Sequence, residues 1–213
     1  MAARESNDER IEILYFLEYR ASIEGLKMAP VYPDAQWLAE CAEHGLCPVC
    51  KHVDRSRYPV PFDIVFAEAP SVDDEVAFVV ATTAVTVWHR SYVEMISKDL
   101  SEHVVGRCLL PDQRVVGDFV TCYGPRYIIV NGGKGSRYAT CPRCGTVDCE
   151  PVGPRHIASP SLTNDRVFQD ARCQFYMTGP ALSEYQTQSD LPLLPKGIGV
   201  SRTSRDDSVL NDA

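Results

Sequence analysis

The stretch Cys141-Pro142-Arg143-Cys144-Gly145 decides the fold, together with an earlier occurrence of the same pattern at Cys47-Pro48-Val49-Cys50. Each is a Cys-x-x-Cys motif in which proline follows the first cysteine. Two thiolates at this spacing can sit on one tight turn and point at one metal ion, and two such turns supply the four ligands of a tetrahedral zinc site. The predicted ligands of a structural Zn²⁺ are therefore Cys47, Cys50, Cys141 and Cys144.

A zinc-ribbon knuckle turns sharply around its metal, and the residue after the second cysteine decides whether it can. Gly145 fits because glycine accepts a positive φ without steric strain. Lys51 holds the equivalent place in the first motif, so it must either tolerate the left-handed conformation or use a different turn. Residues 51 through 140, 90 positions (140 − 51 + 1), separate the motifs. The entropy of loop closure grows only logarithmically with length, so this separation does not exclude a shared site.

Other interpretations of the cysteine motifs remain open. The two motifs could be reduced turns without metal, or a redox-active Cys-x-x-Cys pair. His52 and Cys149 lie close enough in sequence to replace one of the four ligands. If all four thiolates bind zinc, the site is coordinatively closed and leaves no position for a catalytic water. The motifs therefore indicate a structural metal and a protein that is not an enzyme.

The composition of the chain indicates which partners it can bind and in which cellular compartment it works. The chain has 213 residues, a formal net charge of −8 and nine cysteines. The acidic balance argues against a protein that binds the phosphate backbone of nucleic acids. The first residues form no secretory signal and no apolar run is long enough to span a membrane. We expect a cytoplasmic protein whose cysteines are reduced or bound to metal.

Hydrophobic patterning predicts an α+β fold with mixed sheets and few helices. Strands or extended segments are expected at 11–18, 62–66, 76–88 (one bent strand or two short ones), 104–110, 115–123, 126–130, 138–140, 167–168, 173–177 and, as an edge segment, 190–200. Helices are expected after an Asp34 N-cap as far as Gly45, after a Ser91-x-x-Glu94 capping box, and from Thr178-Gly179-Pro180 onward.

Two connections and the domain boundaries complete this prediction. Residues 84–110 form a strand–helix–strand unit that permits parallel pairing, and Asn131-Gly132-Gly133 indicates a hairpin turn. The segments VTVWHRSYVEMIS and CQFYMTGPALSEY both run from a strand through a cap into a helix. We therefore predict one zinc-containing domain over 10–200, with two similar halves joined by a zinc-ribbon-like site. The predicted halves are 10–110 and 111–200, and the predicted disordered ends are 1–9 and 201–213.

The motifs together resemble the bacterial double-CXXCG motif family over about residues 35–190. The matching pieces are Trp37, Gly45-Leu46-Cys47-Pro48-Val49-Cys50, Cys141-Pro142-Arg143-Cys144-Gly145, Gly153-Pro154-Arg155-His156 and Val167-Phe168. Some members of that family are regarded as immunity proteins that neutralise a toxin delivered by neighbouring cells. The resemblance implies a non-enzymatic binding protein with structural zinc.

Three functions follow as hypotheses. The first is an immunity protein that covers a basic toxin with its acidic surface, including the loop 67–75. The second is a zinc-ribbon protein that binds nucleic acid or has a regulatory role. It would have a basic face at Lys51, Arg55, Arg57 and Arg143. The third is an enzyme whose pocket contains His89, Asp118 or His156.

Overall fold

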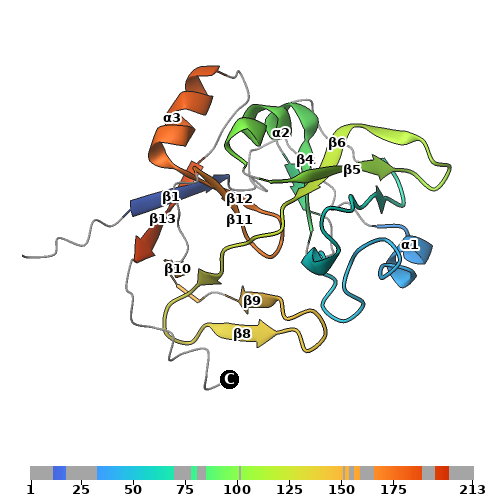
Figure 1. Ribbon diagram of the computed structural model, residues 1–213, viewed down its shortest axis with the longest axis horizontal. Helices are drawn as coiled ribbons and strands as arrows, with labels where there is room; N and C mark the ends of the chain where they lie inside the picture. Colours follow the sequence, from blue (N-terminus) through green and yellow to red (C-terminus); the bar gives the residue numbers. More distant parts are fainter. Residues whose placement is uncertain are drawn as a thin grey trace, which may run out of the picture.

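A computed structural model describes residues 12–17, 33–69, 78–80, 85–100, 102–150, 152–153, 156–158, 166–188 and 195–201. These residues form two sheets, a two-stranded ribbon and a few short helices (Figure 1). The α+β class with mixed sheets and few helices is confirmed. The predicted disordered end at 1–9, residues 202–213 of the predicted tail and most of the acidic loop lie outside the described residues.

The middle of the chain builds a five-stranded sheet. In spatial order its strands are β2 (Ile64–Val65), β5 (Val104–Leu109), β6 (Val115–Tyr123), β4 (Thr86–His89) and β3 (Phe78–Val80). β2 and β5 pair in parallel, whereas the other three pairings are antiparallel. The segment 76–88 thus contains two strands. The strand–helix–strand unit forms, but β6 lies between β4 and β5, so these two strands share a direction without pairing.

The two ends of the chain meet in a six-stranded sheet. In spatial order its strands are β11 (Val167–Gln169), β12 (Phe175–Thr178), β1 (Glu12–Leu17), β13 (Pro195–Ser201), β10 (His156–Ala158) and β7 (Val130–Asn131). Only β10 and β13 pair in parallel. The prediction of an edge segment at 190–200 is wrong, because β13 lies between β1 and β10 and pairs with both.

The third assembly is a ribbon of β8 (Arg137–Thr140) and β9 (Val147–Glu150), which carries the second Cys-x-x-Cys in its turn. In Figure 1 this ribbon lies below the two sheets, with its turn directed toward the chain that follows α1 (Ala35–Ala39). That chain contains the first Cys-x-x-Cys and then the single-turn helix η1 (Arg55–Arg57). The fold therefore places the two motifs on different assemblies that face each other.

The buried apolar side chains of the described residues form two clusters. The first joins the chain around the first motif to the five-stranded sheet, and its members include Trp37, Cys41, Leu46, Val53, Phe62, Ile64, Phe66, Val87 and Cys173. The second lies beneath α2 (Arg90–Ile96) and α3 (Gly179–Gln188), and its members include Trp88, Tyr92, Ile96, Phe175, Met177, Leu182 and Tyr185. The first cluster is the one that fixes the position of Cys47.

The first helix begins as predicted and ends earlier. The carboxylate of Asp34 accepts the backbone N–H groups of Gln36 and Trp37, both at 3.0 Å, which confirms the N-cap. The α-helix stops at Ala39, and turns occupy the chain from there to Gly45, which has a φ of 97°. Turns replace the last predicted helical residues, so Cys41 is buried from a turn instead of from a helix face.

The predicted capping box at Ser91 is wrong. α2 begins one residue earlier, at Arg90, and its N-cap is His89, whose Nδ1 accepts the backbone N–H of Ser91 at 3.3 Å. Glu94 lies on the exposed face of the helix. A histidine in its neutral form with Nδ1 unprotonated fills the role that the pattern assigned to a hydroxyl.

The hairpin turn predicted at Asn131-Gly132-Gly133 is also wrong. β7 pairs with β10 and not with the strand that follows it. The backbone N–H of Gly133 instead donates to the carbonyl of Val152 at 2.8 Å. The glycines carry the chain from the six-stranded sheet into the ribbon, where β8 finds its partner in β9.

The sheets do not divide at residue 110. β1 lies in the sheet formed mainly by the C-terminal residues, and β6 lies in the sheet formed by the middle of the chain. The two strand–helix segments that suggested a repeat do form β4–α2 and β12–α3, and their side chains share the second core cluster. The similarity of two halves is not confirmed.

Candidate metal centre

The first motif forms a knuckle, defined here as residues 46–53, that is closed by backbone hydrogen bonds. Leu46 and Val53 pair as an antiparallel bridge at its base. The N–H of Cys47 donates to the carbonyl of His52 at 2.8 Å, and the N–H of Lys51 donates to the carbonyl of Cys47 at 2.9 Å. Lys51 has a φ of 61°, so it adopts the left-handed conformation that the sequence left open.

The second knuckle, residues 140–147, repeats this geometry. Thr140 and Val147 are the last pair of the β8–β9 ribbon. The N–H of Cys141 donates to the carbonyl of Thr146 at 2.9 Å, and the N–H of Gly145 donates to the carbonyl of Cys141 at 2.9 Å. Gly145 has a φ of 71°. Lys51 and Gly145 therefore hold equivalent positions in two equivalent turns.

The two knuckles bring all four predicted ligands together. The Sγ atoms of Cys47 and Cys141 are 3.7 Å apart, and those of Cys50 and Cys144 are 3.6 Å apart. All four sulfurs lie within 4.8 Å of one another. Four sulfurs at about 2.3 Å from a tetrahedral ion are separated by about 3.8 Å. The arrangement therefore has the size of a four-thiolate metal site, and the four cysteines could hold a metal ion.

The four sulfurs differ in exposure and in acidity. Cys47 and Cys141 are buried, whereas Cys50 and Cys144 are half-buried. Hydrogen bonds from the backbone N–H groups of Cys144 and Arg143 lower the pKa of the Cys141 thiol to about 6. Burial raises the pKa of the Cys50 thiol well above its usual value. Because metal binds the thiolate, the affinity of the site must rise with pH as protons leave the sulfurs.

The two candidate replacement ligands lie outside the converging group. The four atoms that meet are the four Sγ atoms of the Cys-x-x-Cys motifs, and neither His52 nor Cys149 is among them. His52 is buried, and its Nε2 lies 3.5 Å from Oδ2 of Asp148, at ion-pair range but without hydrogen-bond geometry. Cys149 is buried and lines a cavity next to β9.

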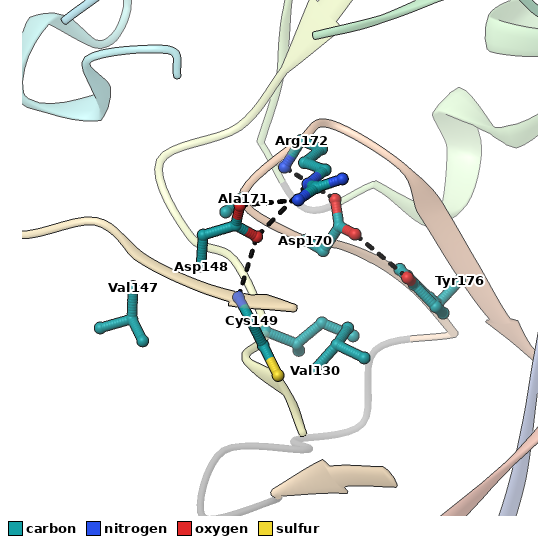
Figure 2. Close-up of a pocket in the computed structure, with 9 residues that line it drawn as sticks. Val130, Val147, Asp148, Cys149, Asp170, Ala171, Arg172 and Tyr176 are labelled. Atoms are coloured by element: carbon teal, nitrogen blue, oxygen red, sulfur yellow. Dashed lines mark hydrogen bonds and ion pairs between the residues drawn. The ribbon is translucent and has the colours of Figure 1, made fainter. Parts of the chain in front are cut away.

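That cavity, of about 60 Å³, lies between the ribbon and the loop that joins β11 to β12. Figure 2 shows Asp148 and Arg172 side by side in its lining, with Nη2 of Arg172 2.8 Å from Oδ2 of Asp148. Burial raises the pKa of Asp170, whose carboxylate accepts the Tyr176 hydroxyl at 3.1 Å. The Asp148–Arg172 pair fastens β9 to the loop between β11 and β12, and the Asp170–Tyr176 contact lies between that loop and β12. The sequence did not predict this pair because isolated Asp and Arg residues carry no distinguishing pattern.

The basic residues proposed to contact nucleic acid are largely engaged within the protein. Arg55 donates to the backbone carbonyls of Gly124, Arg126 and Asp170. Arg57 donates to the carbonyls of residues 42 and 43 at 2.8 and 3.2 Å, and Nζ of Lys51 lies 3.2 Å from Sγ of Cys41. Arg143, the fourth of them, is exposed and makes no comparable contact within the described part of the chain.

Of the three residues suggested for an enzyme pocket, the structure describes the side chain of His89 alone. His89 caps α2 and packs edge-on against Phe119. The side chains of Asp118 and His156 lie outside what the structure describes. The cavity of Figure 2 is lined by other residues.

None of the helices in the described ranges combines the length and the apolar character needed to cross a bilayer.

Comparison with known proteins adds no assignment. No family model matches the chain, and no curated protein matches it. The resemblance to the double-CXXCG motif family therefore stays a prediction from the two knuckles and the segments around them. The convergence of the four cysteines is the finding on which a function can be built.

Proposed function

We propose that Cys47, Cys50, Cys141 and Cys144 bind one structural Zn²⁺ that fastens the β8–β9 ribbon to the rest of the protein. The observation that carries this proposal is the separation of 3.6 and 3.7 Å between sulfurs of different knuckles. Thiolate ligands and tetrahedral spacing favour zinc over harder ions such as Mg²⁺ or Ca²⁺. Four protein ligands leave no open position, so the ion contributes to stability and not to a reaction.

Metal analysis tests this proposal. The chain purified under reducing conditions should contain about one zinc ion, and Co²⁺ substituted for it should give the absorption of a tetrahedral thiolate site. Cys144→Ser should lower the zinc content, whereas Cys149→Ser, in the same ribbon but outside the four-sulfur group, should keep it. Less than half a zinc per chain in the unmodified protein contradicts the proposal.

The metal-bound body is best suited to bind a protein, and an immunity protein that neutralises a basic toxin is the specific form of this proposal. Three observations support it: the convergence of the four cysteines, the net charge of −8 and the internal engagement of Arg55 and Arg57. The resemblance to the double-CXXCG family points the same way. An acidic protein attracts a basic partner over long range and accelerates association.

Co-expression tests the immunity function. Cells that express the product of the adjacent gene should grow only when this chain is also present, and the two proteins should co-purify. Neutralising the acidic loop at Glu68, Asp73, Asp74 and Glu75 should slow association and weaken its salt dependence. The matched control is Glu94→Gln, an exposed acid on α2. Growth inhibition that this chain does not relieve, with no co-purification, rejects the immunity function and leaves the zinc site untouched.

A further inference from the structure

The four sulfurs form an outer pair and an inner pair, and each pair contains one cysteine from each knuckle. The inner pair, Cys47 and Cys141, is 1% and 6% exposed. The outer pair, Cys50 and Cys144, is half-buried, with 3.6 Å between its Sγ atoms. A small oxidant that approaches from solvent therefore meets two sulfurs that already lie in contact and belong to different knuckles.

We propose that Cys50 and Cys144 are a site of oxidative modification, at which hydrogen peroxide forms a disulfide that joins the two knuckles in place of the metal. The release of metal in this proposal rests on the proposed zinc function, whereas the choice of sulfur pair rests on the geometry alone. The product keeps the ribbon attached to the body after the ion has left.

The chemistry needs one peroxide per chain. One thiolate of the pair attacks a peroxide oxygen, the O–O bond breaks, and a sulfenic acid and a hydroxide ion form. The second thiolate attacks this sulfur, so that the S–S bond forms, the S–O bond breaks and a second hydroxide leaves. The two hydroxides take up two protons to become water. The sulfurs lose the two electrons that the peroxide gains, and Zn²⁺ loses two of its four ligands.

The predicted pairing differs from the one that the sequence alone favours. In an unfolded chain, Cys47 would close a ring with Cys50 across two residues, and Cys141 with Cys144 likewise. The pair Cys50 and Cys144 is separated by 94 positions. Loop closure of that length is entropically disfavoured relative to the short rings. A disulfide between the knuckles therefore reports the folded arrangement of the four sulfurs.

Peptide mapping distinguishes the two pairings. The full-length chain, with its zinc content measured first, is treated with an equimolar amount of hydrogen peroxide and free thiols are then blocked. Trypsin cleaves after Lys51 and Arg143, so Cys141 and Cys144 fall on separate peptides. Tandem mass spectrometry of the cross-linked peptides identifies the joined residues, and a chromophoric chelator measures the zinc released.

We expect Cys50 linked to Cys144 as the main product, with zinc released in proportion to the cross-link. Cys149→Ser should give the same product, and the same oxidation in denaturant should give links within each motif. Links within each motif in the folded chain, or no disulfide while the thiols are consumed, overturn the inference. A cross-link between knuckles in a chain without zinc supports this inference and rejects the proposed metal. Bound zinc without any cross-link supports the proposed metal and overturns this inference.

Discussion

The two knuckles have the same backbone in different surroundings. In each, the N–H of the first cysteine donates to the carbonyl five residues later, and the residue after the second cysteine has a positive φ. The first knuckle is set into the main core, where Leu46 and Val53 are each 1% exposed. The second is the tip of a ribbon whose strand β8 has mainly exposed side chains.

The difference indicates how the stability of the site is divided. Burial of apolar side chains can position the first knuckle without metal, since hydrophobic burial is the main stabilising term in folding. The ribbon has little apolar surface of its own, and a two-stranded ribbon is marginally stable alone. We infer that the metal holds the second knuckle against the first, so that the two should respond unequally when the site is perturbed.

Metal removal should have the largest effect. Structural zinc contributes on the order of 10 kcal/mol of binding free energy in small zinc domains. Chelation should therefore lower the melting temperature strongly, and amide exchange should accelerate first in residues 137–150. Hydrogen–deuterium exchange, read by mass spectrometry on both forms, measures this. Equal loss of protection in residues 46–53 and 137–150 would contradict the inferred division.

Arg55→Ala should have the next largest effect, because one guanidinium fastens the chain beside the first knuckle to two distant segments. Arg55 donates to the carbonyls of Gly124, Arg126 and Asp170, and lies 5.1 Å from the ring centroid of Tyr127. Its loss leaves these carbonyls without their donor, and we expect destabilisation of about 3 kcal/mol. Urea unfolding measures it.

Arg57→Ala is the matched control for Arg55. Arg57 also donates to two backbone carbonyls, but both belong to the neighbouring turn at 42 and 43 and the contacts are exposed. We expect a loss of about 1 kcal/mol. If the two variants lose the same stability, Arg55 does not have the long-range role assigned to it.

The contrast between the knuckles also explains what sequence reasoning could predict. The Cys-x-x-Cys spacing identified both turns and their meeting, because the chemistry of thiolate ligands is local to four residues. The strands β9 and β10 were missed, since VDCE and HIA are only four and three residues long, too short to show a hydrophobic pattern that differs from chance. β9 pairs with β8 in the same ribbon, whereas the pairing of β10 depends on β7 and β13, which are distant from it in the sequence.

Asp148→Asn should have a moderate, pH-dependent effect on the attachment of β9. Burial alone would raise the pKa of Asp148, but the His52 imidazole and the Arg172 guanidinium lower it below its usual range. A carboxyl whose pKa is lowered by folding stabilises the protein above the unfolded pKa, about 3.9, and loses this contribution as pH falls through the folded value.

Unmodified Asp148 should therefore give an advantage of about 1–2 kcal/mol over the asparagine variant near neutral pH. The advantage should shrink as the pH falls below about 4. Denaturant unfolding of both chains without metal measures the difference at each pH and keeps zinc release out of the comparison. An advantage that is unchanged in acid would show that packing, and not charge, accounts for it.

Substitutions at the equivalent positions Lys51 and Gly145 should change the stability of the protein least. Gly145→Ala and Lys51→Gly should have effects of opposite sign. A Cβ on Gly145 would meet no atom within 4 Å, so Gly145→Ala tests backbone strain alone and should destabilise by about 1 kcal/mol. Lys51→Gly should relieve similar strain. Lys51→Ala keeps the strain and removes the contact between Nζ and the sulfur of Cys41. Thermal unfolding of the three zinc-loaded variants compares them.

The three results separate two explanations for lysine at position 51. If Lys51→Gly stabilises and Lys51→Ala is neutral, the lysine makes no stabilising contact and only strains the turn. If Lys51→Gly is neutral and Lys51→Ala destabilises by a few tenths of a kcal/mol, the contact with Cys41 offsets the strain. A stabilising Gly145→Ala would contradict the equivalence of the two turns.

Two further errors of the prediction concern the cap of α2 and the position of β13 in its sheet. Ser91-x-x-Glu94 matched a capping box, yet the structure uses the side chain of His89, which a sequence pattern for hydroxyl caps does not include. Residues 195–200 of the predicted segment 190–200 are extended, as expected, but their position inside the sheet depends on β1, more than 175 residues earlier (195 − 17 = 178). Local preferences do not encode that pairing.

The place of β1 between β12 and β13 has a consequence for synthesis of the chain. β1 is made before both of its partners, β12 and β13, which follow it by more than 150 residues. Cys47 and Cys50 likewise emerge 94 positions before Cys141 and Cys144. The nascent chain must therefore carry an unpaired strand and two of the four converging cysteines until these later segments have been made. Pairings over such distances form slowly, so the last step of folding should bring the two ends of the chain together.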